Sequence, residues 1–187
     1  MAAKWQNADG LGVKFGSYVK DSSNYTNKWR AISTLSPIQV AECFFDLTKI
    51  ADATTTYPAD LNNDGTNDGF TEGDFNFPAY SSILRVTIVV DEAAAGGTSI
   101  TVGTYGKTGT AISATSLVTA TEGVKANLDT LGARVYGAGA LVSTSVETAS
   151  VGSAAAFPAI AGSGTWTAGK GRIFVEYIPP VENKTST

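Results

Sequence analysis

One polar run holds the residues best suited to chemistry in this sequence. Residues 60–70, DLNNDGTNDGF, place oxygen-bearing side chains at alternate positions, with Gly65 sixth, as an EF-hand type of calcium loop does. The twelfth position is Thr71, however, so the carboxylate that such a loop requires comes one residue late, at Glu72. A looser calcium site would use the candidate ligands Asp60, Asn62, Asp64, Asp68 and Glu72.

The same run also has the composition of tight turns. Asn, Asp and Gly tolerate positive φ and form hydrogen bonds with their own backbone, which favours turns. The flanking sequence indicates strand and turn rather than the two helices of an EF-hand. The sequence therefore leaves two interpretations open, a calcium loop and a solvated turn, and favours the turn. It indicates no other cofactor.

Few other residues could support catalysis. The chain has no histidine and a single cysteine, Cys43, in the apolar run AECFFDL, where we expect a small buried hydrophobe. Without histidine, the remaining option is a carboxylate pair, either Glu72 with Asp74 or Asp91 with Glu92. Adjacent residues of a strand point to opposite faces, so Asp91 and Glu92 are not expected to share a cleft. We expect no enzymatic activity.

Composition narrows the class of protein further. The chain has 187 residues, which suits one domain, and 20 glycines among many Ala, Ser and Thr. Charged residues make up 16%, below the typical ~25%, and the net charge is −4. A mildly acidic chain lacks the basic surface that nucleic-acid binding requires. No apolar run approaches the ~20 residues of a membrane span. Neither nucleic acid nor membrane is an expected partner.

Alternation of apolar and polar residues predicts strands. The clearest strand, ILRVTIVVDE, is expected to point four side chains inward: Leu84, Val86, Ile88 and Val90. A Gly-Gly turn and a second strand follow, which predicts a hairpin. Elsewhere the alternation places inward Ala41, Cys43, Phe45, Leu47, Ile173, Val175 and Tyr177. With no long helix indicated, the sequence predicts an all-β fold, an antiparallel β-sandwich or jelly roll with an extended N-terminal arm.

The predicted organisation has three parts. Residues 1–36 are an N-terminal arm, residues 37–180 are the sandwich, and residues 181–187 are a C-terminal tail. Aromatic and arginine side chains are common anchors of interfaces. In the arm they give the candidate contacts with a partner protein or a sister subunit, Trp5, Phe15, Tyr18, Trp29 and Arg30. The alternative is that these side chains pack on the chain's own sandwich.

Residues 77–180 contain four segments in a characteristic order. FPAYSSILRVTIVV is followed by GGTSITVGTYGKTGTAI, then by SLVTATEGVKANLDTLGA and the closing GKGRIFVEYIPP. This order of segments resembles that of tailed-phage virion proteins of the head decoration or cement type, including those of cyanophages. The resemblance implies a jelly-roll or β-sandwich subunit that stabilises the capsid as a homotrimer and contacts the major capsid protein. It also implies no enzymatic activity. Such a protein is assembled in the host cytoplasm and lies on the capsid surface.

A second interpretation assigns a different function to the same fold. A calcium-dependent carbohydrate-binding or adhesion module of a phage tail or fibre would use the aspartate-rich loop. It would also need an exposed aromatic side chain, Trp166 or Tyr136, on which a sugar could stack. The alternative for Trp166 is a ring that covers one end of the sandwich.

Overall fold

The structure is a computed structural model that describes residues 4–6, 12–14, 29–33, 37–50, 69–70, 74–142, 151–152 and 154–180. The elements in chain order are β1 Lys4–Gln6, β2 Gly12–Lys14, β3 Trp29–Ser33, β4 Gln39–Asp46, the 3-10 helix η2 Leu47–Lys49, β5 Ser82–Gly96, β6 Ser99–Tyr105, β7 Ala111–Val118, α1 Lys125–Leu128, β8 Arg134–Tyr136, β9 Phe157–Ser163 and β10 Trp166–Ile178. Among the described residues, no helix is long and apolar enough to cross a bilayer.

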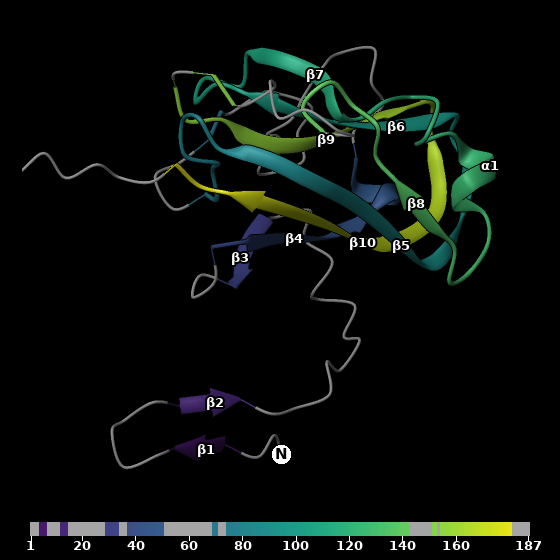
Figure 1. Ribbon diagram of the computed structural model, residues 1–187. Coiled ribbons are helices and arrows are strands. Elements are labelled where there is room, and N and C mark those ends of the chain that lie inside the picture. Colours follow the sequence, from purple (N-terminus) through teal and green to yellow (C-terminus); the bar gives the residue numbers. More distant parts are fainter. Residues whose placement is uncertain are drawn as a thin grey trace, which may run out of the picture.

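Two antiparallel sheets face each other, which confirms the predicted all-β sandwich (Figure 1). One sheet has the strand order β3-β4-β10-β5-β8 and the other has the order β7-β6-β9. Strands β1 and β2 pair with each other in a third, two-stranded sheet. The predicted inward residues of β4, η2 and β10 are all buried: Ala41, Cys43, Phe45, Leu47, Ile173, Val175 and Tyr177. Burying one such aliphatic or aromatic side chain contributes about 1.5–3 kcal/mol, so this core is the main source of stability.

A β-bulge in β5 changes which side chain enters the core. Glu176 of β10 is opposite Arg85, whereas the next residue, Tyr177, is opposite Ile83. The extra residue between them, Leu84, is only half-buried, and Ile83 is fully buried in its place. The predicted inward position of Leu84 is therefore wrong, because the bulge shifts the alternation by one residue.

The predicted hairpin of β5 and β6 is also wrong. These strands belong to different sheets, and the Gly96-Gly97 turn carries the chain from one sheet to the other. Beside it, the turn between β9 and β10 makes the same transfer, and Gly97 donates its amide to the carbonyl of Thr165 at 2.7 Å. Two long, bent strand pairs thus form a corner of the sandwich, as sheet-switching strands do.

Trp166 fills this corner. Its side chain is 5% exposed, and an added Cβ at Gly97 would lie 2.2 Å from two of its ring carbons. Gly97 also has a φ of +48°, in the left-handed region where a side chain is strained. A glycine is therefore required at this turn for two reasons.

Residues 29–33, predicted to lie in the arm, form β3 at the edge of the five-stranded sheet. Ala31 is opposite Ala41 of β4, and Trp29 packs against the core. The sheet thus begins before residue 37, because β4 offers an edge with which this segment pairs. The division into arm, sandwich and tail stays a prediction.

We predict that Gly97→Ala destabilises the protein by at least about 2 kcal/mol, because the methyl group meets the Trp166 ring and the backbone becomes strained. Urea unfolding of the purified protein measures this loss. Gly152→Ala is the matched control, since Gly152 has no atom within 4 Å of an added Cβ. We expect the control to change stability by less than about 0.5 kcal/mol. If the two variants are equally stable, a glycine is not required at position 97 of the corner.

Candidate functional site

The proposed calcium ligands Asp60, Asn62, Asp64, Asp68 and Glu72 lie outside the described residues. Only the last two residues of the run, Gly69 and Phe70, are described, and Phe70 is anchored on the three-stranded sheet. Phe70 donates its amide to the carbonyl of Lys107 at 2.8 Å, and its ring stacks on Phe157 at 4.5 Å. Among the described residues, no group of three or more His, Cys, Asp or Glu side chains is placed to hold a metal. Calcium binding stays a prediction.

The predicted arm contacts fall into two groups. Trp5 lies in β1 opposite Val13, while Phe15 and Tyr18 lie outside the described residues. Trp29 and Arg30 belong to β3 and contact the chain's own sandwich. The buried Nε1 of Trp29 has no hydrogen-bond partner in the described structure. These two residues agree with the alternative in which the aromatic and arginine residues pack on their own fold.

The outer face of the five-stranded sheet carries a cluster of charged and aromatic side chains. We call it the outer sheet face and define it by Arg30, Glu42, Phe44, Arg85, Asp91, Glu92, Lys170, Arg172, Phe174 and Glu176. These side chains come from β3, β4, β5 and β10, and cross-strand pairing brings them together. The outer sheet face is therefore a product of sheet topology rather than of one sequence motif.

Each of two arginines on this face binds a carboxylate and also covers an aromatic ring. Arg172 forms two hydrogen bonds with Asp91, at 2.9 and 3.0 Å, and its guanidinium lies 5.9 Å from the centre of the Phe174 ring. Such paired contacts hold the side chains in one geometry and so reduce the entropy cost of binding a partner.

The second arginine repeats this arrangement at the sheet edge. Arg30 donates to the Oε2 atom of Glu42 from Nε at 3.2 Å and from a terminal nitrogen at 2.8 Å. Its guanidinium lies 5.2 Å from the centre of the Phe44 ring. The carboxylate of Glu42 is only 6% exposed, so Arg30 supplies much of its electrostatic stabilisation.

Asp91 and Glu92 lie on the same face, contrary to the prediction. Glu92 binds Lys170 at 2.8 Å, which raises the pKa of that lysine, while Asp91 binds Arg172. Lys170 and Arg172 are two residues apart on β10 and therefore share a face. A bulge in β5 explains the difference, because Glu92 and Val90 are opposite the adjacent residues 170 and 171. Each carboxylate binds its own cation, which is a poor arrangement for paired acid–base catalysis.

Cys43 is fully buried, as predicted. Burial raises the pKa of its thiol, and the charge of Glu42 adds to the effect. Cysteine reacts as the thiolate, so a thiol with a raised pKa in the core is inert at neutral pH.

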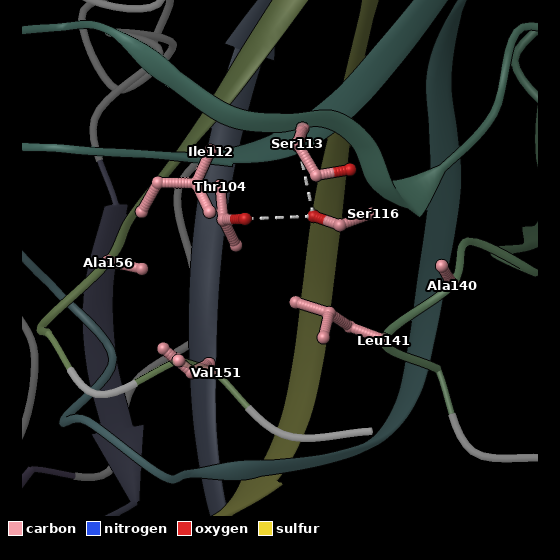
Figure 2. A pocket seen from close by; sticks show the side chains of 9 residues that line it. Thr104, Ile112, Ser113, Ser116, Ala140, Leu141, Val151 and Ala156 are labelled. Carbon is pink, nitrogen blue, oxygen red and sulfur yellow. Dashed lines mark hydrogen bonds between the residues drawn. The ribbon is translucent and has the colours of Figure 1, made fainter. Parts of the chain in front are cut away.

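A small apolar pocket lies between β6, β7 and the segments near residues 141 and 151 (Figure 2). Its volume is about 130 Å³, below the ~300 Å³ at which ligand pockets begin. The hydroxyl of Ser116 donates to the carbonyl of Ser113 at 3.1 Å, so the 3.1 Å contact with Thr104 must have Thr104 as donor. Both hydroxyl groups therefore donate their hydrogen bonds within the protein rather than to a ligand. The residues that line the pocket include no charged side chain.

An open groove of about 560 Å³ runs beside β8, at the other edge of the five-stranded sheet. It is lined from α1 by Asn127 and from β8 by Arg134 and Tyr136. Tyr136 is 57% exposed, whereas Trp166 is buried in the corner. The prediction of Trp166 as an exposed stacking surface is therefore wrong, since the ring covers one end of the sandwich.

Sequence reasoning named Arg30, Asp91 and Glu92 but did not predict that they share one face with the other residues of the outer sheet face. A signal was present, since charged and aromatic residues alternate in ECFFD at 42–46 and in RIFVE at 172–176. The alternation that predicts the inward residues also predicts the outward ones, but it does not show which outward residues of different strands meet.

We predict that Arg172→Met lowers the free energy of unfolding by about 2 kcal/mol, because the Asp91 side chain, 5% exposed, loses its two charged hydrogen bonds. Chemical denaturation measures the loss. Arg85→Met is the matched control, since Arg85 and Glu176 are 59% and 30% exposed, and we expect a loss below about 1 kcal/mol. If both variants lose the same stability, the Asp91–Arg172 pair has no special structural role.

We also predict that stability falls as the pH rises above the ordinary thiol pKa of 9.0. The folded pKa of Cys43 is raised, so the unfolded chain releases this proton first and alkali favours unfolding. Burial also raises the pKa of Tyr105 and Tyr177, which adds to the effect. Cys43→Ala should reduce the slope of unfolding free energy against pH by about 1.4 kcal/mol per pH unit between pH 9.5 and 11. If the slope of unfolding free energy against pH is unchanged in this variant, then folding does not suppress ionisation of the Cys43 thiol.

Comparison with known proteins gives one structural likeness. No protein-family model and no curated protein matches the sequence. A chain of the solved "Cyanophage Pam1 capsid asymmetric unit" is similar with a TM-score of 0.45 and 17% identity, over 88% of this chain and 100% of that chain. A likeness at this level assigns neither function nor family.

Proposed function

We propose that this chain is a structural protein of a tailed-phage virion that decorates the capsid and cements it by binding the major capsid protein. In this proposal it acts as a homotrimer on the capsid surface, after assembly in the host cytoplasm, and has no enzymatic activity. The observation that carries the proposal is the outer sheet face, where ion-paired arginines cover aromatic rings on a rigid sandwich.

The composition of this face supports binding to a protein. Interfaces are enriched in aromatic residues and arginine, and their charged groups bind best when they are already oriented. Of the four ion pairs of the face, one links β3 with β4 and three link β5 with β10, so the face is held on strands rather than on loops. The resemblance of residues 77–180 to decoration proteins supports the capsid as the partner.

A cement protein needs little beyond stable contact area. Binding to two neighbouring capsid subunits opposes their separation, since any ligand of the assembled state stabilises it by mass action. The N-terminal residues, with Trp5, Phe15 and Tyr18, are proposed to add contacts to the capsid or to a sister subunit. A chain that begins at residue 29 would keep β3 and test this contribution.

Substituting the two rings of the outer sheet face tests the proposal. We predict that the Phe44→Thr/Phe174→Thr double variant binds capsids at least about tenfold more weakly, because two aromatic contacts of ~1 kcal/mol or more are lost. Co-sedimentation with capsids of the same phage that lack this protein measures the affinity. The heat stability of the decorated capsids should fall in parallel.

Ile112→Thr provides the control, because Ile112 is 57% exposed on the other sheet. It should bind capsids like the unsubstituted chain. Circular dichroism and melting curves establish that each variant is folded. A folded double variant with unchanged capsid affinity would contradict the proposed contact face, and a folded parent chain that does not bind capsids would contradict the function.

A further inference from the structure

The free edge of β8 has hydrogen-bonding groups that the described chain leaves without partners. Ala133 and Gly137 form backbone hydrogen bonds with β5, and Val135 is paired with Ile88. Because backbone groups alternate in direction along an antiparallel strand, those of Arg134 and Tyr136 point away from β5. β8 is the last strand in the order of the five-stranded sheet, so among the described residues it presents an edge to which another strand can be added.

The side chains on this edge are also available. Arg134 is exposed, and among the described residues it has no ion-pair partner, whereas Arg30, Arg85 and Arg172 each bind a carboxylate. The exposed ring of Tyr136 forms no hydrogen bond in the described structure, and Leu131 close by is 69% exposed. The open groove leaves room beside the strand.

We propose that the edge of β8 binds β8 of a second copy of this chain, antiparallel and about a two-fold axis at Val135. In this register the outward backbone groups of Arg134 pair with those of Tyr136 in the partner, and the reverse pair forms as well. Both side chains lie on the same face of β8, so each guanidinium can lie on the opposite ring. Cation–π contact thus gives each unpaired arginine a partner.

The register explains why the occupant is a second copy. The edge is short, because the amide of Ala138 interacts with the Glu122 carboxylate and helps to lower the pKa of that carboxyl group. The residues that remain for pairing are Arg134, Val135 and Tyr136. When two copies pair antiparallel about Val135, the cationic residue of each copy lies opposite the aromatic residue of the other. The pairing is independent of capsid binding and adds a two-fold axis to whatever cyclic assembly the chain forms.

Cysteine pairs test the register directly. Residues opposite each other in a hydrogen-bonded pair have Cα atoms ~5.5 Å apart, which a disulfide can span. We expect a mixture of the single variants Arg134→Cys and Tyr136→Cys to form a disulfide-linked dimer on mild oxidation. In this dimer the second cross-strand pair still consists of Arg134 from one chain and Tyr136 from the other. Each variant alone should not cross-link, because like positions are ~7–8 Å apart, and the buried Cys43 should not react.

Oligomer mass provides the second measurement. Analytical ultracentrifugation of the unsubstituted chain should give an even number of copies, and Arg134→Glu should halve that mass. Lys107→Glu, in the turn between β6 and β7, makes the same charge change as a control and should leave the mass unchanged. A folded trimer whose mass is unaffected by Arg134→Glu, or a mixture without the disulfide, would overturn the pairing and leave the capsid proposal standing.

Discussion

The packing of Trp166 against Gly97 is the contact on which the rest of the architecture depends. At this corner both β5 and β10 leave the five-stranded sheet, and the adjoining strands of the chain, β6 and β9, are two of the three strands of the other sheet. Because the same two segments build both layers, the angle between the sheets is determined where the indole lies on the turn. A larger residue at the turn would push the layers apart.

The position of β10 in the sheet determines which side chains meet on the outer sheet face. β10 is the central strand of five, so its outward residues have neighbours on both sides, from β4 and from β5. That position lets Arg172 reach Asp91 on one neighbouring strand while it covers Phe174 on its own strand. The bulges in β5 bring two consecutive acids to the same face, where two cations of β10 neutralise them. Irregular strand pairing therefore increases the charge that this face carries in ion pairs.

Because the chain has few charged residues, a charged side chain without an ion-pair partner is unusual in the described structure. Most described cations are paired within the fold, which leaves Arg134 conspicuous beside the exposed ring of Tyr136 at a free strand edge. The two proposals use two different kinds of region, the outer sheet face and the free edge of β8. Pre-organised faces bind a rigid partner, and unsatisfied edges bind a strand.

The sequence by itself determined the secondary structure class, the inward residues of β4 and β10 and the burial of Cys43. These features follow from local alternation, whose period of two is readable within eight residues. Only the tertiary structure decided that β5 and β6 separate into two sheets, that Ile83 replaces Leu84 in the core and that Trp166 is buried. It also decided that Asp91 binds Arg172, 81 residues away. Strand partners and bulges depend on competition among distant segments for the same edges, and no local pattern records that competition.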